Sequence, residues 1–340
     1  MESTKKIIYK SIKYILSTFF AFIILYFLFR NQDPIKLISE IKKVDITWVL
    51  LSMLFGAWAY VSRGLRWIIL LRAMGYNSSK LNSIASVSVG YFTNLFIPRA
   101  GEISRCTSLN QIEKIPVNKL FGTILIERVI DFVSLIILML IAFIVKFEAI
   151  LMFYTTIIQQ NKDGQEGVSF VNILIVILLC FLVFYTIVKK SKMTNKIKSF
   201  YEGLKEGFKS ISHIKNKKLF WFHTVTIWIM YFLMTYICFF CMKETSNLST
   251  SDGLFLLMLG GIGMVIPTPG GIGSYHAIVM TGLAILGVGF IDFNTKESIY
   301  NPALLFPTII HAAQTLVAII MGIIGIFILF LSKKNNIANS

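Results

Sequence analysis

Long apolar stretches constrain this chain more than any other feature of its sequence. A helix needs about 20 apolar residues to cross the roughly 30 Å hydrocarbon layer of a bilayer. The six stretches that qualify or come close are residues 12–29, 47–71, 119–147, 170–188, 219–242 and 302–331. Only 15% of the residues are charged, against about 25% in a soluble domain, which excludes a water-soluble fold. The sequence therefore predicts an all-α integral membrane protein in which residues 1–340 form a single membrane domain.

The distribution of positive charge predicts how these spans are oriented. Residues 189–218 carry ten Lys and two Glu, and the N-terminus, residues 72–80 and the C-terminal tail are also basic. Six crossings place these regions on one side, which the excess of Lys and Arg in cytoplasmic loops identifies as the cytoplasm. We expect a multi-pass protein of the cell inner (plasma) membrane with both termini cytoplasmic. Residues 189–218 themselves have apolar residues at helical spacing, which predicts a basic amphipathic linker on the cytoplasmic leaflet; a solvated linker is the alternative.

Two further apolar runs are too short to cross the membrane and end at proline. Residues 81–97 are followed by Pro98, and residues 253–266 are followed by Pro267-Thr268-Pro269-Gly270-Gly271, after which apolar sequence resumes to about residue 289. Proline lacks the N–H that a helix needs and clashes with the preceding turn, so both helices must break there. With the orientation above, each run enters and leaves on the same side, the first from the cytoplasm and the second from outside.

The order span, re-entrant hairpin, span therefore occurs twice. Residues 47–147 form the first half, and residues 219–331 form a second half that runs in the opposite direction. Inverted repeats with interrupted helices are typical of transporters, whose binding site lies where the breaks meet near the midplane. We expect about six full spans plus two re-entrant helical hairpins arranged as an inverted repeat. The alternative is that both runs are kinked ordinary spans and that the symmetry is a coincidence.

Charged residues inside the apolar segments are the first candidates for a binding site. Each costs roughly 3 kcal/mol or more within a membrane, so it needs a partner or a wet cavity. They form three groups: Arg63 and Arg66; Arg99, Glu102 and Arg105; and Glu127, Arg128 and Asp131. Five Arg against three carboxylates leave an excess of positive charge, and the planar guanidinium suits phosphate. The groups predict a site for an anionic headgroup. The alternative is a salt-bridge network between helices, above all for Arg128 with Asp131, three residues apart.

The second break supports the same site from the opposite side. Gly270 and Gly271 precede a helix whose first N–H groups would face the cavity, and glycine lets a ligand approach the backbone closely. Ser274 and His276 lie in the first turns of that helix, and His311 lies near the middle of the last span. Histidine is a candidate proton carrier because its pKa lies near physiological pH; a neutral, hydrogen-bonded histidine is the alternative.

Other kinds of chemistry find no support in the sequence. Cys238 and Cys241 form C-x-x-C without a second pair of ligands, so we expect no metal site. The sequence contains no cofactor-binding fingerprint or catalytic motif, so no cofactor or catalytic residue is assigned. The basic residues follow the membrane topology, which gives nucleic-acid binding no support.

Three motifs resemble those of a known family. They are Asn94-Leu95-Phe96-Ile97-Pro98-Arg99-Ala100-Gly101-Glu102-Ile103-Ser104-Arg105, Glu127-Arg128-Val129-Ile130-Asp131 and Pro269-Gly270-Gly271-Ile272-Gly273. Together, over roughly residues 45–330, they are similar to the transmembrane flippase-like domain of lysylphosphatidylglycerol synthases, a family that includes stand-alone members. The resemblance implies an integral membrane fold and movement of a lipid between leaflets. It also implies a site lined by Arg99, Glu102, Arg105, Glu127, Arg128, Asp131, Gly270 and Gly271.

Two departures from the family pattern shape the functional expectation. The fused enzymes carry a soluble aminoacyl-transferring domain after the membrane part, whereas this chain ends nine residues past its last apolar stretch, so aminoacyl transfer is not expected. An acidic residue often follows the Pro-Gly-Gly-x-Gly motif, where this chain has His276, which argues against a cationic headgroup.

We therefore expect a lipid translocase without enzymatic activity, acting on a phospholipid or a polyprenyl-phosphate-type anionic lipid. One alternative is an intramembrane transferase acting on a lipid carrier, for which Glu127 and His311 would be the acid–base pair. The other is a non-transporting partner of a lipid or cell-envelope synthase. The expected partners are the bilayer and an anionic lipid, and the chain could also associate with a second copy of itself or with an envelope-synthesis enzyme.

Overall fold

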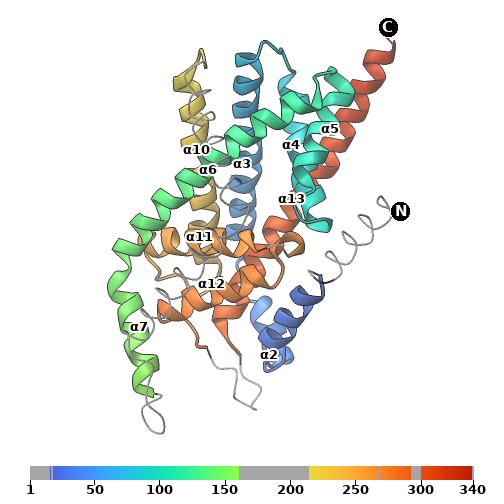
Figure 1. The fold of residues 1–340 in the computed structure, drawn as a ribbon. Coiled ribbons are helices and arrows are strands. Elements are labelled where there is room, and N and C mark those ends of the chain that lie inside the picture. Colours follow the sequence, from blue (N-terminus) through green and yellow to red (C-terminus); the bar gives the residue numbers. More distant parts are fainter. Residues whose placement is uncertain (1–15, 17, 161–213, 267, 292–299, 339–340) are drawn as a thin grey trace, which may run out of the picture.

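The computed structural model describes residues 16, 18–160, 214–266, 268–291 and 300–338, and all regular structure in these residues is helical (Figure 1). Within them, four helices are long and apolar enough to cross a membrane. They are α3 (Ile46–Ala73), α6 (Val117–Val145), α10 (Lys217–Ile237) and α13 (Pro302–Ala338). The prediction of an all-α protein with several apolar membrane helices is confirmed.

The other two predicted spans are not settled by the described residues. Of residues 12–29, the described part is residue 16 and the apolar helix Thr18–Phe29, which is shorter than a bilayer crossing requires. The predicted span 170–188 lies outside the described residues, and so does the predicted amphipathic linker 189–218 up to residue 213. The count of six spans stays a prediction.

The first proline-terminated run forms a helical hairpin of α4 (Lys80–Phe96) and α5 (Gly101–Glu113). Helix α4 ends two residues before Pro98, as expected from the clash of proline with a preceding helical turn. The amide side chain of Asn94 accepts a hydrogen bond of 2.7 Å from the backbone N–H of Gly101, which satisfies a free donor at the start of α5. At the open end, the Glu113 carboxylate accepts from Asn82 at 2.8 Å. Both ends of the hairpin are therefore fixed by side-chain hydrogen bonds.

The second run forms a helix, a break and a shorter helix. These are α11 (Thr250–Val265), the 3₁₀ turn η3 (Pro269–Gly271) and α12 (Ser274–Ile285). The break contains Gly270 and Gly271 at φ +58° and +80°, a left-handed conformation that costs glycine little. The Ser274 hydroxyl then donates to the carbonyl of Gly263 at 2.9 Å, which ties the start of α12 to the last turns of α11.

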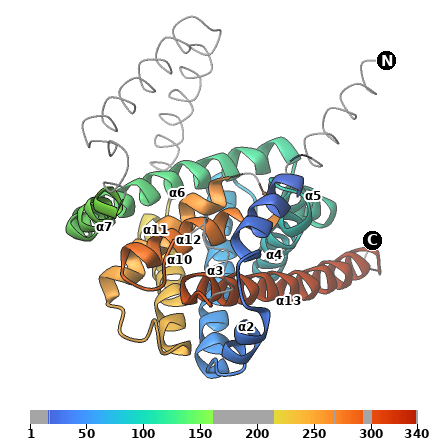
Figure 2. The same ribbon diagram turned by 90° about the horizontal axis from the view of Figure 1, so that it is seen from below.

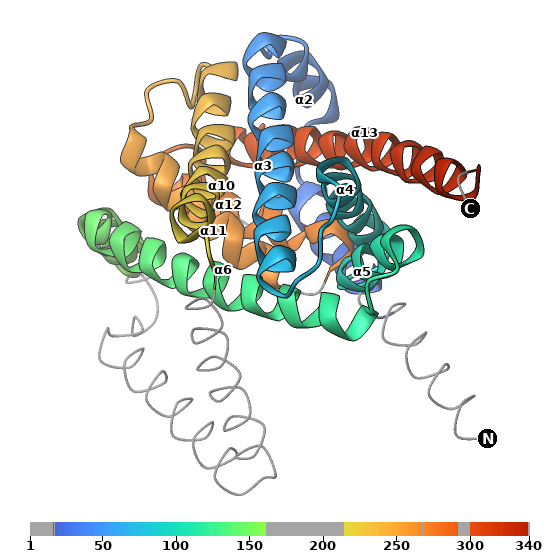
Figure 3. The same ribbon diagram turned by 90° about the horizontal axis from the view of Figure 1, so that it is seen from above.

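The two hairpins occupy different levels of the molecule but meet at their breaks. Helices α4 and α5 lie beside the half of α13 nearest the C-terminus, and α11 and α12 lie at the level of its other half (Figure 1). Seen from below, α11 and α12 lie between α6 and α13 (Figure 2), and seen from above α3 lies between α10 and α4 (Figure 3). A β-carbon placed on Gly270 would be 3.6 Å from Cδ2 of Leu95, in the last turn of α4. The two helix breaks are therefore in contact.

Candidate functional site

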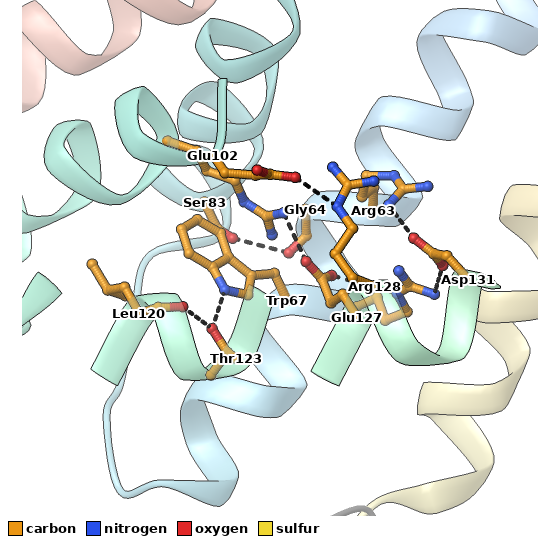
Figure 4. A network of polar contacts seen from close by, with 12 residues as sticks. Arg63, Gly64, Trp67, Ser83, Glu102, Leu120, Thr123, Glu127, Arg128 and Asp131 are labelled. Atoms are coloured by element: carbon orange, nitrogen blue, oxygen red, sulfur yellow. Dashed lines mark hydrogen bonds and ion pairs between the residues drawn. The ribbon is translucent and has the colours of Figure 1, made fainter. Parts of the chain in front are cut away.

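Five ionisable side chains from three helices form a charge cluster inside the helix assembly (Figure 4). Helix α3 contributes Arg63 and Arg66, α5 contributes Arg105, and α6 contributes Glu127 and Asp131. Each of the five side chains is at most 12% exposed. Charges at this depth need partners, and the cluster supplies them across helices rather than along one helix.

Two carboxylates of α6 hold the three guanidinium groups. Asp131 contacts Nη1 of Arg63 at 2.6 Å and Nη1 of Arg66 at 2.8 Å. Glu127 contacts Nη1 of Arg105 at 2.7 Å and Nε of Arg66 at 3.4 Å. These contacts join α3, α5 and α6 at one level. In lipid, apolar side chains gain little by leaving the lipid tails for another helix, so polar contacts such as these contribute to helix association.

The charge cluster has more positive charge and more donors than its own carboxylates use. Three guanidinium groups and two carboxylates leave one positive charge uncompensated. Within the described part of the chain, Nη2 of Arg66 and both Nε and Nη2 of Arg105 have no hydrogen-bond partner. An unsatisfied buried donor costs free energy, so an anion that reached these atoms would be stabilised. The arrangement can therefore act as an anion-binding site.

Aromatic side chains that the sequence analysis did not select surround the charge cluster. The guanidinium of Arg105 lies 3.7 Å from the centroid of the Trp67 ring, a cation–π contact. Trp67 Nε1 donates to Thr123 Oγ1 at 2.7 Å, and Tyr231 accepts from Arg63 at 3.5 Å. Helical spacing could have selected Trp67 and its hydrogen-bond partner Thr123, since Trp67 follows Arg63 by four residues and Thr123 precedes Glu127 by four. Tyr231 comes from α10, which no local spacing connects to Arg63.

The remaining charged residues of the predicted site lie at its edge. Arg128 pairs with Glu102 at 2.8 Å, and both side chains are partly exposed, at 53% and 31%. The alternative of a salt-bridge network between helices is confirmed for the charge cluster, but the pair Arg128 with Asp131 is not formed, because Asp131 is held by the two Arg of α3. Arg99 is exposed, has φ +63° directly after Pro98, and has no ion-pair partner among the described residues.

The second break places its predicted residues together. His311 Nε2 lies 2.9 Å from the carbonyl oxygen of Gly270, and because a carbonyl can only accept, Nε2 is the donor. The rings of His276 and His311 have centroids 4.8 Å apart. Ser274 is used differently from the prediction: its hydroxyl bonds with Thr268 and with the carbonyls of Gly263 and Gly271, so it holds the turn closed.

The predicted residues thus form two groups joined by α4. One is the charge cluster, and the other contains Gly270, Gly271, His276 and His311. Tyr91 of α4 lies 6.0 Å from the Arg63 guanidinium, and Leu95, one turn later, contacts Gly270. Glu127 contacts the Arg residues of α3 and α5, whereas His311 contacts Gly270 and His276. In the described residues, no group of three or more His, Cys, Asp and Glu could hold a metal ion.

Comparison with known proteins places the chain in a family. Residues 14–292 match the lysylphosphatidylglycerol synthase TM region. The chain belongs to this family. A UPF0104 membrane protein of Methanocaldococcus jannaschii is 22% identical in an alignment of 291 positions, which covers 74% of this chain and 79% of that protein. A UPF0104 membrane protein of Pyrococcus horikoshii is 26% identical over 113 residues, 32% of this chain and 34% of that protein. No solved structure matches the chain.

The lysylphosphatidylglycerol synthase TM region contains most of the predicted site. The whole charge cluster lies within the matched residues, and so do Arg99 and the second break from Gly270 to His276. His311 lies beyond residue 292, where the match ends. The resemblance drawn from the three motifs is therefore confirmed at the level of the family.

Proposed function

We propose that the protein is a translocase that moves a lipid with an anionic headgroup, of the phospholipid or polyprenyl-phosphate type, between the leaflets. The observation that carries the proposal is the contact of Gly270 with Leu95, which brings the two helix breaks together. One turn earlier on α4, Tyr91 lies 6.0 Å from Arg63 of the charge cluster, which has an uncompensated positive charge. Irregular backbone within a membrane is tolerated where it lines a cavity or is buried in protein, and broken helices form the binding sites of many transporters. Membership in the lysylphosphatidylglycerol synthase TM family supports a lipid as the cargo.

The topology that we propose is an inverted repeat in the plasma membrane. Helices α3 and α6 flank the first hairpin in sequence, and α10 and α13 flank the second. The hairpins lie toward opposite ends of α13 (Figure 1), which supports entry of the first from the cytoplasm and of the second from outside. The basic loop at residues 72–80 supports the cytoplasmic assignment of the first hairpin's open end.

Arg99 is the residue that we assign to headgroup capture. It is exposed and follows the first break, and it has no carboxylate partner in the described residues, so its guanidinium is available to phosphate. From there the headgroup would pass to the unsatisfied donors of Arg66 and Arg105. A planar guanidinium binds phosphate through two parallel hydrogen bonds, which lysine cannot do.

The test is a leaflet-accessibility assay with purified protein in liposomes that contain a fluorescent phosphatidylglycerol. Wild type should move the labelled lipid faster than protein-free vesicles do. The Arg99→Ala variant should slow the movement about tenfold or more, because a hydrogen bond to a charged group contributes about 1.5–3 kcal/mol. The matched control is Arg72→Ala, an exposed Arg at the end of α3 that lies outside the site.

Two outcomes would reject the proposal. One is a wild-type rate equal to that of empty vesicles, as a non-transporting partner protein would give. The other is a new lipid product in the mass spectrum of the recovered lipids, which a transferase would give. The transferase alternative gains no support from the contacts, because Glu127 is held by Arg66 and Arg105 while His311 bonds with the Gly270 carbonyl.

A further inference from the structure

A pair of histidines lies at the second break, at the point where two helices meet. His276 is in the first turn of α12, and His311 is on α13. Both residues are buried, at 6% and 7% exposure, and their ring centroids are 4.8 Å apart. His311 donates to the carbonyl of Gly270, whereas Nδ1 of His276 has no hydrogen-bond partner among the described residues. The pair therefore combines one ring whose tautomer is fixed with one ring that has a free nitrogen.

The surroundings of the histidine pair contain few other ionisable groups. Tyr275 of α12 lies 5.4 Å from the His311 ring and is hydrogen-bonded to Gln314. Cys238, in the 3₁₀ turn η2 (Cys238–Cys241), is an ionisable neighbour of Tyr275. The helix Thr18–Phe29 covers Gly273 with the backbone of Ala21 and the side chain of Ile24. In the described residues neither ring forms an ion pair with a carboxylate.

These surroundings limit the histidine pair to one proton at most. Two imidazolium rings 4.8 Å apart in a buried site would repel each other strongly. The first turn of α12 also presents its positive dipole end to His276, which disfavours a cation there when the site is empty. The same dipole end and free N–H groups favour an anion. A phosphate beside the break would supply the missing counter-charge and allow one ring to hold a proton.

We propose that His276 and His311 bind one proton together with the anionic headgroup, so that lipid binding at the second break is coupled to proton uptake. This inference rests on the proposed function, because it takes the same headgroup as the ligand. Linkage is reciprocal: if a bound proton raises the affinity for the anion, the bound anion raises the affinity for the proton by the same factor. The affinity for the lipid should therefore rise as the pH falls, by up to about tenfold per pH unit for one linked proton.

The experiment counts protons taken up when purified full-length protein binds a short-chain phosphatidylglycerol. Titration calorimetry at pH 7 in two buffers of different ionisation enthalpy gives the number of protons per lipid bound. The phosphodiester probe stays ionised at this pH and cannot itself supply the change. Wild type should take up between about half a proton and one proton per lipid. The double variant His276→Gln/His311→Gln should take up none. The variant His223→Gln tests the other buried histidine of the described residues, which is on α10 near Arg66 and also has an unpartnered Nδ1; its proton count should equal that of wild type.

The outcomes separate this inference from the proposed function. Wild-type protein that binds the lipid without proton uptake would overturn the histidine assignment and leave translocation intact. Proton uptake that persists in the double variant would place the proton elsewhere and also overturn it. Folded wild-type protein that binds no anionic lipid at all would overturn both. If the double variant does not fold, a wild-type count of zero still overturns the inference, and uptake that persists in both single variants, His276→Gln and His311→Gln, does so too.

Discussion

Glu127 is the residue on which the charge cluster depends most. Its side chain is 2% exposed and contacts guanidinium groups from two different helices, α3 and α5. Replacement by glutamine would leave Arg66 with one ion-pair partner and Arg105 with none. Breaking a buried ion pair by removing one partner costs about 3–5 kcal/mol, because the other charge stays buried and unpaired. Thermal unfolding of Glu127→Gln in detergent should therefore begin at a clearly lower temperature than that of wild type.

Glu102 provides the matched control for this prediction. It also pairs with an Arg, Arg128, at 2.8 Å, but both side chains of this pair are partly exposed. Exposed ion pairs contribute about 1 kcal/mol or less, so Glu102→Gln should leave the unfolding temperature nearly unchanged. Equal destabilisation by the two substitutions would show that Glu127 is not buried as described.

At the residue scale, the sequence identified the charged residues but not their partners. Arg63, Arg66, Glu127 and Asp131 were found because a charge in an apolar stretch is costly and therefore conspicuous. The partners of these residues lie on other helices, so spacing along one helix could not find them. Arg128 with Asp131 shows the difficulty: the spacing permits the pair, but α3 and α5 offer both residues better-placed partners.

At the element scale, the first hairpin depends on the close approach of its two helices at Gly101. A β-carbon at this position would overlap the carbonyl oxygen of Gly90 and the side chain of Asn94. Gly101→Ala should therefore force α5 away from α4 and cost about 1–3 kcal/mol, as overpacking usually does. It should also slow lipid movement, because the same shift displaces Arg105. Thermal unfolding and the leaflet-accessibility assay measure the two effects.

Gly122 of α6 is the matched control for Gly101. No atom of the described residues lies within 4 Å of a β-carbon placed there. Alanine in an exposed helix interior is favoured over glycine by about 0.5–1 kcal/mol, so Gly122→Ala should unfold at the same or a slightly higher temperature. If Gly101→Ala and Gly122→Ala had the same unfolding temperature, the described packing of α4 against α5 would be contradicted.

Helix limits were predictable wherever a proline or a change in polarity marks them. The end of α4 before Pro98, the starts of the four long apolar helices and the ends of α3 and α6 follow the sequence within a few residues. The end of α10 does not. Apolar sequence continues to residue 242, but the α-helix ends at Ile237 and a 3₁₀ turn, Cys238–Cys241, follows. Hydropathy reports composition and not winding, so it could not detect that change.

At the scale of the whole molecule, the testable feature is which end of the helix assembly faces the cytoplasm. Residues 45 and 241 lie at one end, since the N–H of Asp45 donates to the carbonyl of Cys241 at 3.0 Å. The loop after α3 is consequently at the other end. With our orientation, a membrane-impermeant maleimide added to intact spheroplasts should label Asn247→Cys, and Asn77→Cys only after the membrane is opened. Unsubstituted protein gives the background from native cysteines. Labelling of Asn77→Cys in intact spheroplasts would reverse the orientation.

The assembly of the two hairpins could be anticipated only in outline. Two breaks in corresponding places suggested that they meet, and Leu95 does lie against Gly270. The connection between the charge cluster and the second break runs through Tyr91 and Leu95 of α4. Tyr91 and Leu95 are residue types that any apolar helix contains. Their position between the two groups results from the packing of helices that are distant in sequence, so the sequence could not predict it.

The row of polar residues on α6 has a consequence for how this helix can change over time. Thr123, Glu127 and Asp131 follow one another at intervals of four and contact α3 through Trp67, Arg66 and Arg63. The outward residues of α6 face lipid, where one apolar side chain serves as well as another. Inserting or deleting a single residue between Thr123 and Asp131 would instead rotate part of the row by about 100° and separate it from α3. Evolution can therefore substitute the lipid-facing residues of α6 freely, whereas the number of residues between Thr123 and Asp131 must stay the same.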